Sequence, residues 1–208
     1  MRTSEFAGIL YSTGAIHVNV DDRGVLTHDA EAPICFDLGV LMLQPALIHA
    51  AVRLMKHVSC NDVIGADAVT GVALSGLPYS FEYSQQTDLP HLLPQRQQAV
   101  QRKTKTTQSH ASVARGDRVL ILDDVLSAGE NISVAAGSLR TQLLKVTDAL
   151  VMLDLQQGGR DVLKNRRITL HSVLTVDFLL RTLRVRKCIS PKAEDVLRQH
   201  MKIVEDFE

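Results

Sequence analysis

Residues 118–129 read RVLILDDVLSAG, and this stretch decides the fold class of the chain. The run VLIL near its start has the apolar composition of a buried strand. Two carboxylates, Asp123 and Asp124, follow directly, and the small-residue turn Ser127-Ala128-Gly129 then opens an amphipathic helix predicted to reach about Leu144. A buried strand that passes straight into a helix is typical of a parallel sheet with helices on both faces.

Strand and helix patterns alternate on both sides of this stretch. Short apolar runs predict three further buried strands, which are residues 62–66, 149–153 and 168–174. Apolar side chains at helical spacing predict three more helices, which are residues 44–57, 71–81 and 176–183. A last helix is expected to begin at Ser190-Pro191, because an N-cap serine followed by proline at the first position is a favourable helix start.

The prediction is an α/β fold with a central parallel sheet flanked by helices. Residues 41–208 are expected to form its core and residues 1–40 a small N-terminal hood, within a single domain overall. In the hood, residues 15–20 alternate with the period of a strand. The turn at residues 21–24 should lead into residues 25–27 and close a β-hairpin.

The composition excludes several classes of protein. The chain has 208 residues and is 45% hydrophobic, which excludes disorder. Lys plus Arg and Asp plus Glu both number 23, so no polybasic surface for nucleic acid or membrane is expected. No apolar run is long enough to span a bilayer, and MRTSEFAGILY at the start does not read as a secretory signal.

The cysteines and histidines show no metal-binding pattern. Cys35, Cys60 and Cys188 are widely spaced and form no CxxC pair, so they are predicted to be buried or neutral thiols of a cytoplasmic protein. His171 lies on the last predicted strand and is expected to be packed or hydrogen-bonded. The remaining histidines lack the spacing of zinc ligands.

The end of the central strand is the expected binding site, because ligands of open parallel sheets lie outside the carboxyl ends of the strands. Backbone N–H groups of Ser127-Ala128-Gly129 and of the next residues would converge at a helix N-terminus, where a phosphate is favoured. Asp123 and Asp124 could accept hydrogen bonds from sugar hydroxyls or hold Mg²⁺ through water.

Two other interpretations of the acidic pair were weighed. Acidic residues after a strand can simply cap the next helix, and the turn then needs no ligand. A receiver domain also places an acidic pair after one strand and a further aspartate after another, as Asp123-Asp124 and Asp154 do. Too few residues follow Asp124 for the βα units that such a domain needs, so this interpretation is rejected.

Residues 85–116 are polar and lack apolar periodicity after Leu93. A stretch of this length inside a compact domain is typical of a functional loop or a long arm. Its basic segment, Arg102-Lys103-Thr104-Lys105, could meet an anion, or could be merely solvated.

VLILDDVLSAG resembles the phosphoribosyl-pyrophosphate (PRPP) signature of type I phosphoribosyltransferases. Other segments resemble the orotate phosphoribosyltransferase half of UMP synthase, so that the resemblance covers roughly residues 32–183. These segments are APICFDL (32–38), KVTDA (145–149), VMLD (151–154), QGG (157–159), LK (163–164) and LHSVLT (170–175).

The resemblance implies a Rossmann-like core with a smaller hood, a homodimer, and PRPP with Mg²⁺. In that family, orotate N1 displaces pyrophosphate from ribose C1, and catalysis is mostly positioning and charge stabilisation. Carried over, Asp123 and Asp124 bind the ribose hydroxyls and hold the metal through water. The resemblance assigns binding of the 5′-phosphate to the turn at Ser127, Ala128, Gly129, Glu130 and Asn131. It assigns the role of the catalytic loop cations to Lys103 and Lys105.

The chain also departs from the family pattern. Gly39 and Leu155 stand where the family has arginines, the second of which contacts the orotate carboxylate, and a leucine cannot make that contact. In the loop, the match Arg96-Gln97-Gln98 replaces the catalytic lysine by glutamine, so Lys103 or Lys105 would serve only if the loop is reregistered. Glu130 and Asn131 replace small hydroxyl residues, and a carboxylate beside a phosphate costs energy unless it points away.

Three hypotheses about function follow. The first is an enzyme that makes orotidine 5′-monophosphate from orotate and PRPP in pyrimidine (UMP) biosynthesis. The second is a catalytically impaired relative that binds PRPP or a nucleotide as a sensor or partner subunit. The third is a phosphoribosyltransferase for a base without a carboxylate, for which Leu155 would be suitable lining.

Overall fold

A five-stranded parallel sheet forms the centre of the protein. The structure is a computed structural model that describes residues 1–27, 32–72, 74–93 and 113–202. The strands lie in the order β4-β3-β5-β6-β7, and every neighbouring pair is parallel, as the sequence predicts. Their bounds are β3 (Ala68–Gly71), β4 (His91–Leu92), β5 (Val119–Leu126), β6 (Asp148–Asp154) and β7 (Thr169–Thr175).

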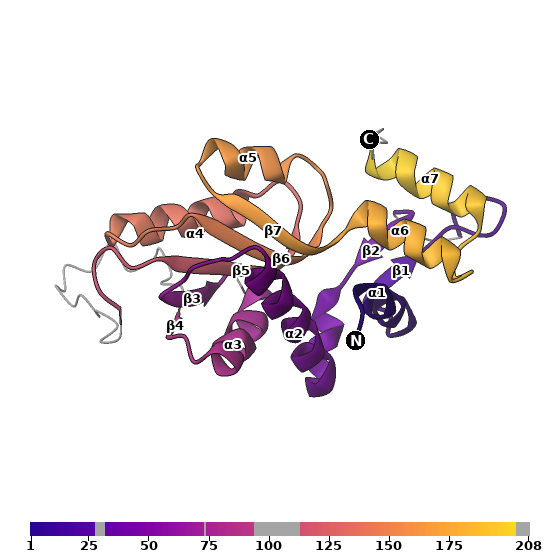
Figure 1. Ribbon diagram of the computed structural model, residues 1–208. Coiled ribbons are helices and arrows are strands. Elements are labelled where there is room, and N and C mark those ends of the chain that lie inside the picture. Colours follow the sequence, from indigo (N-terminus) through magenta and orange to yellow (C-terminus); the bar gives the residue numbers. More distant parts are fainter. Residues whose placement is uncertain (28–31, 73, 94–112, 203–208) are drawn as a thin grey trace.

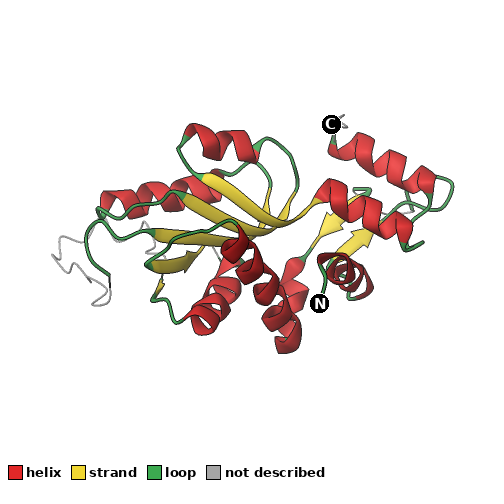
Figure 2. Cartoon of the chain, viewed as in Figure 1, coloured by secondary structure: helices red, strands yellow, loops and turns green. Residues whose placement is uncertain are grey.

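Helices cover both faces of this sheet (Figure 1, Figure 2). One face carries α2 (Pro45–Asn61) and α3 (Gly76–Thr87), and the other carries α4 (Glu130–Thr141) and α5 (Gly159–Asn165). Alternate side chains of a strand point to opposite faces, so Leu120 and Leu122 of β5 join one apolar cluster and Val119 and Ile121 the other. A strand buried on both faces must be apolar throughout, which explains the continuous run VLIL.

Elements from both ends of the chain pack together beside the sheet (Figure 1). They are α1 (Thr3–Ser12), β1 (Ile16–Val18), β2 (Ile34–Phe36), the 3₁₀ helix η1 (Leu38–Leu43), α6 (Val176–Val185) and α7 (Pro191–Met201). Strand β1 pairs with β2 in antiparallel fashion, and α1 packs against α6. Their apolar side chains continue the cluster that covers the α2 and α3 face of the sheet. The division into residues 1–40 and 41–208 stays a prediction.

Two helix starts follow from local sequence chemistry. Ser190 is the N-cap of α7, and its hydroxyl accepts a hydrogen bond from the N–H of Ala193 at 3.1 Å. Proline occupies the first turn of both α7 and α2, where its missing N–H costs no helical hydrogen bond. The predicted starts of these two helices are confirmed.

The predicted hairpin of the hood forms, but its pairing is short. The antiparallel bridge Val20↔Leu26 lies across the turn, and the N–H of Thr27 donates to the carbonyl of Asn19 at 2.8 Å. Residues 16–18 do not take part in this pairing. The partner of β1 is β2, which lies further along the chain. A turn signal identifies where the chain reverses, whereas pairing is set by which apolar faces meet in the core.

Several other boundaries differ from the sequence predictions. Residues 62–66 form a turn after α2 rather than a strand, and Val63 is 85% exposed with a φ of 53°. The helix expected at residues 71–81 begins only at Gly76, because Gly71 is the last residue of β3. Helix α4 ends at Thr141, before the predicted end at Leu144.

Two further expectations concern the thiols and the long loop. All three cysteines are free, but Cys35 and Cys60 are exposed rather than buried. Most of the polar stretch at residues 85–116 lies outside the described residues, after β4. Within the described part of the chain, no helix is long and apolar enough to cross a membrane.

Candidate functional site

The acidic pair lies within β5 rather than after it. Strand β5 continues to Leu126, and Asp123 is paired in register with Val151 of β6. Because neighbouring side chains of a strand point to opposite faces, the two carboxylates occupy different environments. Asp123 is 5% exposed, whereas Asp124 is half-buried.

Burial and the neighbouring charge change the acidity of Asp123. Burial, followed by the charge and side-chain hydrogen bond of Asp124, raises the pKa of the Asp123 carboxyl to about 8. Two hydrogen bonds oppose this rise, one from the N–H of Asp124 at 3.0 Å and one from the side chain of Ser75. Near neutral pH, Asp123 therefore holds a proton more readily than an ordinary aspartate does.

The start of α3 packs directly on the acidic pair. A Cβ at Gly76 would lie 2.7 Å from the carbonyl oxygen of Leu122 and 3.1 Å from Oδ1 of Asp123, so only glycine permits this approach. Tyr79 on the same helix is fully buried, and its hydroxyl donates to the carbonyl of Leu38 at 3.4 Å. Burial, followed by the charges of the two aspartates, raises the pKa of this tyrosine.

A small-residue turn joins β5 to α4 and forms a phosphate-sized recess. Ser127 and Ala128 are exposed, and Gly129 is the N-cap of α4 with a φ of 79° that favours glycine. The first N–H groups of a helix have no helical partner, so those that follow Gly129 are available to an anion. We call Ser127-Ala128-Gly129 the phosphate turn.

The recess at this turn has a volume of about 120 Å³. It brings together six of the seven residues that the sequence assigned to PRPP, with Asp124 outside the lining. Its walls are Asp123, Val125, Leu126, Ser127, Ala128, Gly129, Glu130, Asn131 and Ile132. Val125, Leu126 and Ile132 were not predicted, because apolar side chains beside an anion site carry no distinctive sequence signal. Glu130 is exposed, so its carboxylate is solvated.

A second turn supports the first. Residues 155–159, which we call the supporting turn, connect β6 to α5. A Cβ at Gly159 would overlap the carbonyl oxygen of Ser127, and a Cβ at Gly129 would lie 3.1 Å from the carbonyl oxygen of Gly159. The two turns therefore pack backbone to backbone. In the sequence, QGG (157–159) is only one of the segments that carry the family resemblance, and nothing there predicts this contact.

Of the positions that depart from the family pattern, Glu130 and Asn131 line the recess, whereas Leu155 and Gly39 do not. Leu155 is 8% exposed and belongs to the apolar core, and its N–H donates to the carbonyl of Leu126 at 2.9 Å. Gly39 follows Asp37, whose Oδ1 accepts the N–H of Gly39 at 3.1 Å and caps η1. The predicted loop residues Arg96, Gln97 and Gln98, and the catalytic candidates Lys103 and Lys105, lie outside the described residues.

His171 lies near the opposite, amino-terminal edge of the sheet. Its Nδ1 is 2.6 Å from Oδ2 of Asp62, and its Nε2 is 2.8 Å from Oδ1 of Asp148. These bonds connect α2 to the start of β6, so His171 is hydrogen-bonded, as expected. In the described ranges of the chain, no group of three or more His, Cys, Asp and Glu residues could hold a metal ion by itself.

Comparison with known proteins finds relatives of one family, the enzymes named orotate phosphoribosyltransferase or UMP synthase. The chain is 32% identical over 178 residues to uridine 5′-monophosphate synthase of Bos taurus. The aligned region covers 86% of this chain and 37% of that protein. The chain thus spans little more than a third of this curated relative. No family model matches the chain.

Solved structures support the same fold. UMP synthase of Leishmania donovani has a TM-score of 0.76 at 23% identity, covering 96% of this chain and 42% of that one. Orotate phosphoribosyltransferase of Aeropyrum pernix has a TM-score of 0.68 at 25% identity, covering 86% and 98% respectively.

Proposed function

Because this chain belongs to the type I phosphoribosyltransferases and is similar to those that act on orotate, we propose that it catalyses phosphoribosyl transfer from PRPP to orotate. In this reaction, N1 of orotate releases its proton and forms a bond to C1 of the ribose as the bond from C1 to the pyrophosphate oxygen breaks. The products are orotidine 5′-monophosphate and pyrophosphate, which would serve pyrimidine (UMP) biosynthesis.

One observation carries the proposal. The acidic pair and the phosphate turn occur together on one strand–turn–helix unit at the carboxyl edge of the sheet. The recess offers backbone N–H groups to a 5′-phosphate and carboxyl oxygens to ribose hydroxyls. A single ribose ring can span the distance between the backbone N–H groups and the carboxyl oxygens. A ribose phosphate requires this arrangement.

The two aspartates would have different roles. A protonated carboxyl both donates and accepts hydrogen bonds, whereas a carboxylate only accepts. With its raised pKa, Asp123 can therefore donate to one ribose hydroxyl while Asp124 accepts from another. The remaining negative charge near C1 would favour the positive charge that develops on the ribose as pyrophosphate leaves.

Mg²⁺ is part of the proposal as a companion of PRPP. Magnesium in such sites keeps several waters and binds substrate phosphates with only one or two carboxylates, which fits the acidic pair. Asp123 and Asp124 would hold it through water, where it would neutralise charge on the pyrophosphate. Lys103 and Lys105 stay proposed as loop cations.

We also retain a homodimer and a cytoplasmic location as proposals. Free, exposed thiols at Cys35 and Cys60 persist in a reducing compartment, which supports the location. Sedimentation equilibrium of the purified chain would test the dimer. A monomer across the micromolar range would contradict it.

The direct test is the loss of orotate absorbance in a mixture of protein, orotate, PRPP and Mg²⁺. A protein-dependent rate that needs all three additions is expected. A parallel reaction with uracil, assayed by pyrophosphate release, tests a base without a carboxylate. If the folded protein turns over neither base while a known enzyme is active in the same buffer, the proposal is refuted and a PRPP or nucleotide sensor becomes the better hypothesis.

A binding experiment tests the acidic pair separately. The double variant Asp123→Ala/Asp124→Ala should weaken PRPP binding about tenfold or more, because the ribose hydroxyls lose their partners. The control Asp22→Ala/Asp195→Ala removes the same charge at two exposed positions and should leave binding unchanged. Equal affinities of the two double variants, measured by calorimetry, would contradict the assigned site.

A further inference from the structure

We propose that the ion pair between Asp154 and Arg160 positions the phosphate turn and thereby sets its affinity for the 5′-phosphate. Neither residue lines the recess, so both are positioning residues that act through the supporting turn. This inference rests on the proposed function in one respect, because it takes a phosphate group to be the ligand of the phosphate turn.

Asp154 is the last residue of β6 and is almost completely buried, at 1% exposure. Its Oδ1 accepts the N–H of Gln156 at 2.9 Å, and its Oδ2 accepts Nη2 of Arg160 at 3.0 Å. A carboxylate removed from water is costly unless it is paired and hydrogen-bonded on both oxygens. Asp154 meets that condition only when the supporting turn holds its present shape.

The supporting turn is strained and is held from two sides. Gln156 has a φ of 56°, a left-handed conformation that is unfavourable for a residue with a side chain. Asp154 holds the N–H of Gln156, while the N–H of Asp177 at the start of α6 donates to Oε1 of Gln156 at 3.0 Å. Such a conformation persists only where the surroundings over-determine it.

Arg160 connects this turn to the next strand. Its Nη1 donates to the carbonyl of Leu170 in β7 at 3.0 Å, while Nη2 binds Asp154. The guanidinium is half exposed, so its charge is screened and its main contribution is the fixed geometry of two N–H donors. A lysine has no such fork and cannot reproduce both bonds in one orientation.

The supporting turn transmits this geometry to the phosphate turn by backbone contact. Gly159 packs against the carbonyl of Ser127 and against Gly129, and Leu155 donates its N–H to Leu126. The exposed residues of the phosphate turn have few partners of their own, so a shift of the supporting turn would move the N–H groups that face the anion. A shift of about 1 Å would move an N–H donor out of the distance range of a good hydrogen bond, so the affinity for the anion would fall.

The test measures ribose 5-phosphate binding by calorimetry and the KM for PRPP in the orotate assay. Arg160→Met should weaken ribose 5-phosphate binding about tenfold or more and raise the KM for PRPP, with a smaller change in kcat. Arg160→Lys should fall between the wild type and Arg160→Met. Arg166→Met removes an exposed arginine just beyond α5 and serves as the matched control, with binding unchanged.

Arg160→Met leaves the charge of Asp154 without its partner, and this could unfold the chain. A second variant keeps the test valid in that case. In Asp154→Asn/Arg160→Met the side chain of residue 154 is neutral and can still accept the N–H of Gln156. This double variant should fold and should still bind ribose 5-phosphate more weakly than the control, because the link to Leu170 is lost.

The outcomes separate this inference from the proposed function. Variants of Arg160 that melt at a lower temperature yet bind ribose 5-phosphate like the wild type would overturn the positioning role. If the wild type binds ribose 5-phosphate without turning over a base, the proposed reaction fails, and the variants still decide the positioning role. If the wild type does not bind ribose 5-phosphate at all, the positioning role is refuted, and the orotate assay alone decides the proposed reaction.

Discussion

Replacing Asp123 by asparagine is expected to stabilise the protein at pH 8 and to change its stability little at pH 4. The pKa of this carboxyl is raised from 3.8 to about 8 in the folded state, mainly by burial and by the charge of Asp124. Asparagine mimics the protonated acid, since its Oδ1 can still accept the N–H of Asp124. The variant therefore removes the cost of ionising a buried group without opening a cavity.

The sign follows from proton binding. Between pH 4 and 8 the unfolded chain has released the Asp123 proton and the folded chain has kept it, so the folded state loses relative stability as pH rises. A shift of about four pKa units, at about 1.4 kcal/mol per unit, corresponds to a loss on the order of 5 kcal/mol. The stability that this group contributes is fully present below pH 3.8 and is lost as pH rises to about 8.

Urea unfolding at intervals from pH 4 to 9 measures this effect. The free energy of unfolding of Asp123→Asn minus that of the wild type should be near zero at pH 4, increase by up to about 1.4 kcal/mol per pH unit, and level off above pH 8. Asp22→Asn, an exposed control, should show no such pH dependence. Parallel stability curves for Asp123→Asn and the wild type would refute the reasoning, because a carboxyl with an ordinary pKa gives no slope in this range.

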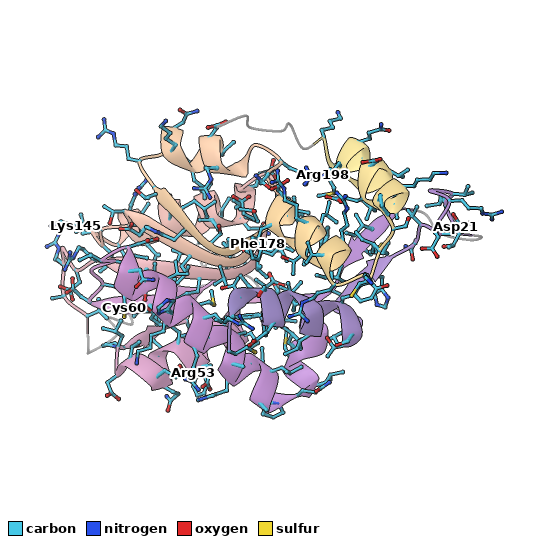
Figure 3. All side chains as sticks on the ribbon, turned by 45° about the vertical axis from the view of Figure 1, so that its right-hand side comes forward. Asp21, Arg53, Cys60, Lys145, Phe178 and Arg198 are labelled. Atoms are coloured by element: carbon cyan, nitrogen blue, oxygen red, sulfur yellow. The ribbon has the colours of Figure 1, made fainter. Side chains whose placement is uncertain are left out.

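Three further changes probe the backbone contact, the cap and the ion-pair network. Gly159→Ala should destabilise the fold by about 2 kcal/mol or more, since the new Cβ would overlap the carbonyl of Ser127; an unchanged melting temperature would argue against the backbone packing. Ser190→Ala should cost about 1 kcal/mol in urea unfolding, and Ser190→Asp should restore most of it, because only an acceptor caps α7. Arg198, shown on α7 in Figure 3, binds Asp177 and the buried Glu194, which also pairs with Arg184. Arg198→Met should therefore cost about 2 kcal/mol, and Glu194→Gln in addition should recover part of that loss. Independent, additive losses in that pair would refute the coupling.

Some of the site could be read directly from the sequence. Asp123 and Asp124 adjoin the phosphate turn in the chain, so one strand–turn–helix unit brings Asp123 to the recess and leaves Asp124 next to it in β5. The supporting turn is different, because Gly159 lies thirty residues from Gly129 and meets it only when β5 and β6 pair. Leu155 likewise gave no sign that its side chain enters the core rather than the site.

The sequence by itself determined the features that depend on neighbours along the chain. Short apolar runs identified β5, β6 and β7, and the Ser190-Pro191 pair identified the start of α7. Tertiary structure alone decided the pairing of β1 with β2, the extension of β5 beyond the acidic pair, and the link from Asp154 through Arg160 to the next strand. The physical reason is that helix periods and caps are set by bonds between residues a few positions apart. Strand partners and buried charges are instead set by which distant surfaces exclude water together.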